Sequence, residues 1–197
     1  MSELSNTKSI SSIDSVYGYF SKPIATLHEF YLNKEILEPD VYTDWYDIIR
    51  NAREDDSVVI HINSCGGNIA TALQMLRAMT ECRAEITCSV EGDCMSAATM
   101  IFLQGDILEV SPHSVFMFHN YSGGIFGKGG EMYDTVIHER NWSISLLTSM
   151  YKHFLTSEEI AAILENKDIW MDSEEVVKRL TKRAELMAKE DAEQDNS

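Results

Sequence analysis

Ser96 is the residue of this chain that is best placed to act as a nucleophile. It follows the apolar run 85–90 and a short polar stretch, and it precedes the apolar run 97–103. This pattern predicts a strand, a tight turn and a helix, with the serine in the first helical turn. Unpaired backbone N–H groups and the positive end of the helix dipole lie there and could stabilise an oxyanion. Serine is also a common N-cap residue, so the position by itself is a weak signal.

A candidate base is His119, which follows the apolar run 115–118. Functional groups gather at the carboxyl ends of the strands in a parallel sheet. His119 could therefore take a proton from Ser96 and return it to a leaving amine. A structural histidine that caps a strand would have the same sequence setting.

A pair of glycines could supply a further part of an acyl-transfer site. Gly66 and Gly67 follow the apolar run 58–62, and glycine allows backbone conformations and close approaches that other residues do not. The Gly67 N–H could then donate to an oxyanion together with the N–H of Ala97. An ordinary strand–helix turn explains the two glycines more simply, because single glycine motifs are unspecific.

An acidic residue would complete a catalytic triad by orienting the imidazole and stabilising its cation. Asp168 lies in the segment 166–170, between two predicted helices. The chain has 32 acidic residues, so the order of residues alone does not select Asp168.

The elements that would position these residues alternate between strands and helices. Apolar runs and helical spacing predict strands at 58–62, 85–90, 107–110 and 115–118, and helices at 44–52, 69–79, 96–104 and 131–154. Apolar patches at 16–20 and 30–32 could be short strands, and capping signatures at 156–159 and 172–175 open two more helices. The run 58–62 is predicted to be buried on both faces. The alternation predicts an α/β fold with a mainly parallel sheet.

Composition limits the function classes. The chain has 197 residues and a net charge of −16, so we expect one domain and no nucleic-acid partner. No apolar run is long enough to cross a membrane, and the N-terminus lacks the apolar core of a signal peptide, so we expect a cytoplasmic protein without membrane contact. The four cysteines show no CxxC spacing, which favours free thiols over disulfides and over a zinc site. No metal or other cofactor is expected.

Four separated segments together resemble the ClpP family, the proteolytic subunits of the Clp protease. They are residues 62–67, 92–98, 118–124 and 168–175. They occur in the family's order and at nearly its spacing, and the resemblance covers roughly residues 26–178. It implies a ClpP/crotonase-type fold, which is a spiral of ββα units with a protruding strand–helix handle.

The resemblance also implies a division of the chain. Residues 1–25 would be a divergent N-terminal segment, residues 26–182 the protease domain and residues 183–197 an acidic, flexible tail. The handle would cover about residues 122–155, and apolar residues of its long helix would join subunits. These are Met132, Val136, Ile144, Leu147 and Met150.

The family's functional residues carry over by position. Ser96 would be the nucleophile, His119 the base and Asp168 the third member of the triad, and the N–H groups of Gly67 and Ala97 would form the oxyanion hole. An exposed strand edge in the Gly-rich segment would bind an extended substrate through backbone hydrogen bonds. The residues implied for this edge are Gly123, Gly124, Ile125 and Phe126.

The implied function is that of a serine endopeptidase which degrades unfolded polypeptides inside a closed chamber. The chamber would be a homo-oligomer of two heptameric rings, a tetradecamer, to which a hexameric AAA+ unfoldase delivers substrates. Some positions depart from the family. Cys65 replaces a usual proline, residues 93–95 differ from the usual residues before the nucleophile, and the first 25 residues match poorly.

Three other functions are compatible with these features. The divergent ends motivate a phage-type relative that trims capsid or scaffold proteins. A crotonase-fold enzyme that binds an acyl-CoA thioester has an oxyanion hole of similar origin, but it needs no Ser–His–Asp set. The departures around Ser96 allow a non-catalytic subunit that assembles with active ones.

Overall fold

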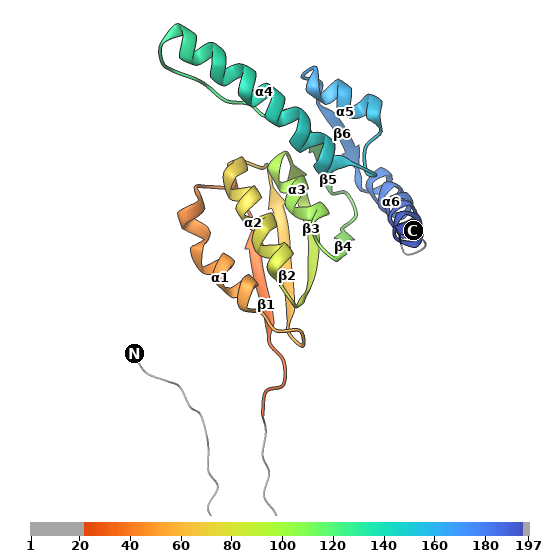
Figure 1. Ribbon diagram of the computed structural model, residues 1–197. Helices are drawn as coiled ribbons and strands as arrows, with labels where there is room; N and C mark the ends of the chain where they lie inside the picture. The colour runs from red at the N-terminus through yellow and green to blue at the C-terminus, as the bar shows by residue number, and fades with distance from the viewer. Residues whose placement is uncertain (1–21, 195–197) are drawn as a thin grey trace, which may run out of the picture.

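A six-stranded sheet carries the candidate residues. The computed structural model describes residues 22–194 (Figure 1). The strands are β1 (Leu27–Leu32), β2 (Ser57–Ser64), β3 (Glu85–Met95), β4 (Ile107–Val110), β5 (Val115–Phe118) and β6 (Ile169–Asp172). Their order is β1-β2-β3-β5-β6, with β4 beside β3. Every pairing among these strands is parallel except that of β5 with β6, so the predicted α/β fold with a mainly parallel sheet is confirmed.

β3 is longer than the sequence predicts, and its length positions Ser96. Residues 87–90 pair with β4, and residues 93–95 pair with β5. The tight turn predicted at residues 91–95 is therefore wrong. Pairing with neighbouring strands keeps this stretch extended, because its backbone N–H and C=O groups are satisfied in that way. The strand delivers the chain directly to Ser96.

Helices α1 (Thr43–Asn51), α2 (Ile69–Glu81) and α3 (Ala97–Leu103) pack on one face of the sheet (Figure 1). A 3-10 turn, η1 (Pro39–Tyr42), precedes α1. α2 begins after Asn68, whose side-chain oxygen accepts the backbone N–H of Thr71 at 3.0 Å. This N-cap fixes the start of the helix that follows the two glycines. The main core lies between these helices and the strands.

One face of β2 is buried and the other is not. Val58, Ile60 and Ile62 are buried, whereas His61 between them is half-buried and its Nδ1 lies 2.6 Å from a carboxylate oxygen of Glu91. Burial on both faces, as predicted for this strand, is therefore wrong. Side chains alternate along a strand, so His61 falls on the face away from the helices.

α4 (Gly129–Tyr151) extends from the body of the molecule as a long arm (Figure 1). The chain runs outward from β5 to the tip of this arm, and the helix returns from it. The buried residues of α4 all lie near its base, and they are Ser143, Leu147 and Tyr151. The helix ends before the predicted residue 154, because Lys152 leaves the helical conformation and His153 has a φ of 67°.

α5 (Ser157–Leu164) and α6 (Ser173–Gln194) complete the described chain. The predicted capping box of α5 is confirmed, since the Thr156 and Glu159 side chains each accept the other residue's backbone N–H. α6 differs from the prediction of a flexible tail from residue 183, because residues 183–194 continue the helix. Side chains tie this part of α6 to the body: Arg183 donates to the Leu103 carbonyl at 2.9 Å. The remaining tail residues, 195–197, lie outside the described residues.

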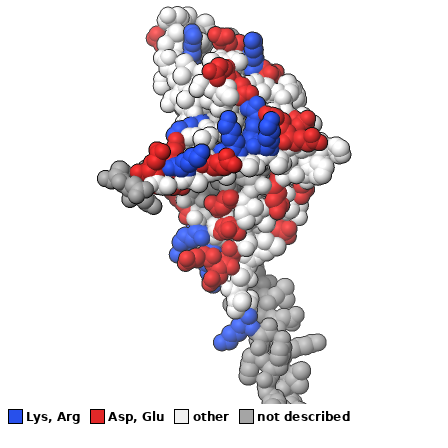
Figure 2. Space-filling model, turned by 90° about the vertical axis from the view of Figure 1, so that its right-hand side faces the viewer, with Lys and Arg blue, Asp and Glu red and all other residues white. Residues whose placement is uncertain are grey.

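Ion pairs join α5 to α6. Lys and Arg side chains lie among Asp and Glu side chains on the face that carries these helices (Figure 2). Arg179 donates two hydrogen bonds to the Glu159 carboxylate, at 2.7 and 2.8 Å, and one to Glu175 at 2.7 Å. A bidentate pair of this kind restrains the two helices relative to each other.

Two further predictions concern a strand near the N-terminus and membrane-spanning segments. The strand predicted at 16–20 lies outside the described residues. Within residues 22–194, the structure contains no helix with the length and apolar character needed to span a membrane.

Candidate active site

Ser96 stands at the junction of β3 and α3 in a strained backbone conformation. It is the N-cap of α3, with a φ of 54° and a ψ of −128°, and its side chain makes no capping hydrogen bond. A positive φ is uncommon for a residue other than glycine and is typical of positions that the surrounding structure constrains. The Ser96 N–H donates to the Met117 carbonyl at 2.8 Å, which fixes the residue against β5. The hydroxyl is thus free to face the end of β5.

His119 follows β5 directly, and the structure brings its ring to Ser96. The Ser96 Oγ lies 2.7 Å from His119 Nε2, which is hydrogen-bonding distance. A hydroxyl that donates to Nε2 requires a neutral ring that carries its proton on Nδ1. The strand predicted before His119 is confirmed, and the parallel pairing of β3 with β5 explains why the two residues meet.

Asp168 lies on the opposite side of the His119 ring. It precedes β6, whose first residue, Ile169, pairs with Phe118 in β5. This antiparallel pairing places Asp168 beside His119, with 3.9 Å between Asp168 Oδ1 and His119 Nδ1. That distance allows an ion pair but exceeds a hydrogen bond, and the Asp168 side chain is 51% exposed. The third candidate is therefore near the histidine but held less closely than Ser96.

Two glycines approach the Ser96 junction from β2. Gly66 has a φ of 89° and Gly67 a φ of 145°. A Cβ on Gly66 would lie 2.6 Å from the Met95 carbonyl oxygen, and one on Gly67 would collide with the Ile36 backbone. Both positions therefore need glycine for conformation and for space.

The predicted oxyanion donors both present unpaired N–H groups. The Gly67 N–H has no hydrogen-bond partner within residues 22–194. Ala97 is the first residue of α3, a position whose N–H has no intrahelical acceptor. Both residues line the cavity that contains Ser96 and His119. The arrangement can therefore offer two donors to a developing oxyanion.

A cavity of about 400 Å³ surrounds Ser96 and His119. Gly123 and Gly124 line it, whereas Ile125 and Phe126, which were implied for the same substrate edge, do not. Phe126 is fully exposed. The segment 119–128 contains no strand, which differs from the implied strand edge, because a strand needs a partner for its hydrogen bonds and the described chain supplies none here.

The other wall of this cavity was not predicted from the sequence. Glu139 and Trp142 of α4 line it, together with the apolar side chains of Ile69, Met100 and Leu147. Glu139 and Trp142 are three residues apart, so they lie on one side of the helix. The sequence shows this spacing, but it does not show which side of α4 faces Ser96.

Two of the residues predicted to join subunits instead belong to the core of the single chain. Leu147 is 2% exposed, and Met150 packs against the same core. Val136 and Ile144 are exposed, as expected for a contact surface. Helical spacing alone could not separate the base of the arm, which packs on the body, from its outer part.

Buried side chains beneath Ser96, on the side of the core, hydrogen-bond to its backbone and to one another. Thr99 Oγ1 donates to the Ser96 carbonyl at 2.6 Å and lies 2.8 Å from the Tyr151 hydroxyl. Tyr151 is fully buried and its ring meets Phe118, the residue before His119, edge to face. Burial raises the pKa of Tyr151, so the hydroxyl stays protonated and can donate to Thr99. The base of α4 is thus linked to both candidate catalytic residues.

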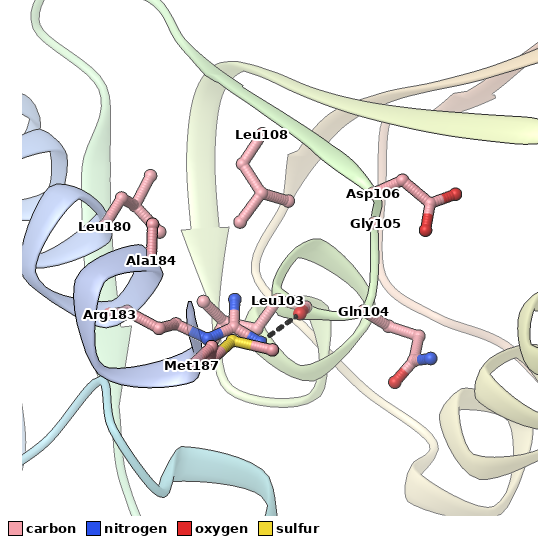
Figure 3. Close-up of a pocket in the computed structure, with 9 residues that line it drawn as sticks. All are labelled: Leu103, Gln104, Gly105, Asp106, Leu108, Leu180, Arg183, Ala184 and Met187. Carbon is pink, nitrogen blue, oxygen red and sulfur yellow. Dashed lines mark hydrogen bonds between the residues drawn. The ribbon is translucent and has the colours of Figure 1, made fainter. Parts of the chain in front are cut away.

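A larger cavity lies elsewhere, between the end of α3 and α6 (Figure 3). It measures about 610 Å³, and the Arg183 guanidinium reaches across it to the Leu103 carbonyl. No serine, cysteine or histidine lines it. We therefore place the candidate site at the smaller cavity, which holds the candidate nucleophile and the candidate base.

The cysteines and possible metal ligands add no second site. All four cysteines are free, as the sequence predicts. Burial raises the pKa of Cys88 to about 12 and that of Cys94 well above its usual value, so neither thiol is a ready nucleophile. Within residues 22–194, no group of three or more His, Cys, Asp and Glu side chains is arranged to hold a metal ion.

Comparison with known proteins found one family match. The family model described as Clp protease matches residues 40–179, which is more than half of the chain. The matched region contains every candidate residue discussed above, and the mostly parallel sheet is consistent with the ClpP/crotonase fold. A search of curated proteins found no match.

Proposed function

The chain belongs to the Clp protease family, and on that premise we propose that it is a serine endopeptidase with Ser96 as nucleophile, His119 as base and Asp168 as third member. The observation that carries the proposal is the 2.7 Å contact between Ser96 Oγ and His119 Nε2 inside a cavity with two unpaired N–H groups. A capping serine or a structural histidine needs neither that contact nor that cavity.

The geometry supports acyl transfer. As Ser96 Oγ attacks the scissile carbonyl carbon, His119 Nε2 takes its proton, and the N–H groups of Gly67 and Ala97 donate to the oxyanion. The imidazolium then protonates the leaving amine, and the peptide bond breaks to leave an ester on Ser96. A water molecule gives a proton to Nε2 as it attacks the ester, and Nε2 returns that proton to Ser96 Oγ as the Oγ–acyl bond breaks, which releases the acid and restores the serine and the neutral histidine. Asp168 stabilises the imidazolium in both steps.

The substrate in this proposal is an unfolded polypeptide. Positions 123 and 124 are open glycines, because a Cβ there would meet nothing within 4 Å. An extended peptide could therefore lie against the backbone of this segment and pair with it, whatever its side chains are. Such pairing would supply the strand partner that the segment lacks.

We also propose that the subunits assemble as a homo-oligomer of two heptameric rings, which receives substrates from an AAA+ unfoldase. The outer part of the arm supports a contact between copies, because several large apolar side chains there are exposed. They are Phe126, Tyr133, Val136 and Ile137. A cluster of this kind is unusual on a surface that stays in water.

Fluorophosphonate labelling tests the nucleophile. Intact mass should show one adduct on the wild-type protein and none on Ser96→Ala. Ser122→Ala is the matched control, because Ser122 lines the same cavity and should keep the adduct. An assembled wild-type protein without an adduct would contradict the proposal and favour a non-catalytic subunit or an acyl-CoA enzyme.

Native mass spectrometry tests the assembly. We expect ring-sized particles that Ile137→Asp weakens and that Asp134→Asn, on the same helix, leaves intact. A monomer at micromolar concentration would contradict the ring proposal.

A proteolysis assay tests the unfoldase. Cleavage of a folded reporter protein should require a hexameric ATPase. Trimming of a phage capsid or scaffold protein without an ATPase would instead favour the phage-type role.

A further inference from the structure

We propose that Glu139 and Trp142 form a subsite that selects a lysine or arginine side chain of the substrate at the scissile bond. The hydrolytic consequence of this inference rests on the proposed peptidase function. The observation behind it is a carboxylate in the wall of the catalytic cavity. Glu139 lines the same cavity as Ser96 and His119, and no cation or donor within residues 22–194 pairs with its side chain.

Glu139 differs from the other half-buried glutamates because its side chain has no partner. Other half-buried glutamates have a partner: Glu159 pairs with Arg179, and Glu190 lies 3.2 Å from Lys152. Glu139 is also half-buried, yet it faces a cavity instead of a basic side chain. A partly desolvated carboxylate without a partner gains most from a cation that enters the cavity.

The other residues around Glu139 fit the rest of a basic side chain. Trp142, Met100, Leu147 and Ile69 offer apolar surface in the same cavity. Lysine and arginine have an aliphatic stem and a charged tip, so the stem can pack on these walls while the tip reaches the carboxylate. The Trp142 ring adds a face on which a cation can lie.

Competing substrates would fit less well. An aliphatic side chain of the same length would fill the apolar walls but leave the Glu139 carboxylate desolvated and unpaired. A glutamate would be repelled. The cavity of about 400 Å³ is within the range of ligand pockets, so size does not exclude a long side chain.

The whole chain carries a net charge of −16, which attracts cationic peptides without any subsite. A matched variant separates the two effects. Asp134 is exposed on α4, outside the lining of the cavity, so Asp134→Asn removes the same charge as Glu139→Gln without touching the subsite.

The test uses full-length protein and coumarin-releasing peptides that differ only in the residue before the scissile bond, with lysine, arginine, norleucine or glutamate there. We expect kcat/KM for lysine to exceed that for norleucine by about tenfold or more, as one charged hydrogen bond in a desolvated site allows. Glu139→Gln should remove this preference, and Asp134→Asn should keep it. A norleucine preference that Glu139→Gln leaves unchanged, with hydrolysis still dependent on Ser96, would overturn the subsite and leave the peptidase proposal standing.

A binding measurement covers the case without hydrolysis. Ser96→Ala should bind a fluorescein-labelled lysine peptide more tightly than the norleucine peptide at 0.15 M salt, where long-range attraction is screened, and adding Glu139→Gln should abolish the difference. If the wild type hydrolyses nothing but this difference appears, the peptidase proposal fails and the subsite stands. If neither measurement shows a preference for lysine, the subsite is overturned.

Discussion

The two sides of His119 are built differently. On one side, Ser96 Oγ lies 2.7 Å from Nε2, and the contact is made at the carboxyl ends of the two paired strands β3 and β5. On the other side, Asp168 Oδ1 lies 3.9 Å from Nδ1, and the Asp168 side chain is 51% exposed. The proposed nucleophile and base are thus in contact within the single chain, whereas the proposed third member lies farther from the ring.

The reason lies in what supports each side. Beneath Ser96 the structure is buried and fully paired, with Thr99 on the Ser96 carbonyl and Tyr151 on Thr99. Asp168 is held through the short pairing of β6 with β5, through a 3.4 Å hydrogen bond from Asn120 to Asn166, and through the α5–α6 layer, which ion pairs join. Core packing positions side chains more tightly than an exposed layer does. We infer that the positions of Ser96 and His119 are held more tightly than that of Asp168.

Removing either member of the close pair should have the largest effect. Ser96→Ala and His119→Ala should each lower kcat on an unstructured peptide by about 10⁴-fold or more, because nucleophile and base act as one unit. The double variant should lose no more than the single ones. Circular dichroism should show an unchanged fold, and full activity in His119→Ala would break the comparison at its stronger side.

Removing the distant carboxylate should have a smaller effect. Asp168→Asn should lower kcat by about 10²-fold, less than the roughly 10⁴-fold loss known where the triad aspartate is buried and hydrogen-bonded. Asp172→Asn, another acidic residue at the other end of β6, is the matched control and should stay near wild type. A loss as large as that of His119→Ala would mean that Asp168 closes on His119 during turnover, and the comparison would then hold for the free enzyme alone.

The support beneath Ser96 can be tested through stability. Thr99→Val should lower the free energy of unfolding by about 1–3 kcal/mol, because it leaves the buried Tyr151 hydroxyl without its partner. Urea unfolding measures this, and Thr99→Ser should recover most of the loss. Adding Tyr151→Phe to Thr99→Val should also recover part of it, since the unpaired hydroxyl is then gone. An unchanged midpoint in Thr99→Val would show that this layer does not hold the junction.

The close pair could largely be predicted from the sequence. Ser96 and His119 each follow an apolar run, and runs of that kind become parallel strands whose ends meet at one edge. Local pattern made both residues candidates because they stand where local elements end, and the resemblance to the ClpP family assigned their roles. The extension of β3 through residues 91–95 could not be predicted, since it depends on pairing with β5, which comes 20 residues later in the chain and satisfies the backbone of a stretch that contains Gly92.

The distant side and the supports could not be predicted in this way. Asp168 was one of 32 acidic residues, and only the β5–β6 pairing brings it to His119. Thr99 and Tyr151 are 52 residues apart in the chain. Whether Glu139 lines the cavity depends on which side of α4 faces the body. Helical spacing shows that residues share a face, but contacts with distant elements decide what that face meets.

The smallest expected effect is a pH dependence of the layer that carries Asp168. Hydrogen bonds from Arg179 hold the pKa of Glu159 below its usual range. A carboxylate whose pKa is lower in the folded than in the unfolded chain adds stability above the unfolded value, and that stability is lost as the pH falls through the folded value. Arg179→Gln should therefore lower the thermal midpoint at pH 7 by roughly 2–4 °C, which corresponds to about 1 kcal/mol of stability. The difference in thermal midpoint between this variant and the wild type should become smaller as the pH falls below about 4.5.

Lys178→Gln is the control for this last prediction, because Lys178 is an exposed neighbour whose loss removes the same charge. If Arg179→Gln lowers stability and also reduces kcat while Lys178→Gln does neither, the α5–α6 ion pairs position Asp168 as well as stabilise the fold. If the difference in thermal midpoint between Arg179→Gln and the wild type stays constant from pH 7 to pH 4, the Glu159 carboxylate does not provide the lost stability. The side of the site that carries Asp168 would then be held by the β5–β6 pairing and the Asn120–Asn166 hydrogen bond without this ion pair, and the contrast with the buried side would be sharper.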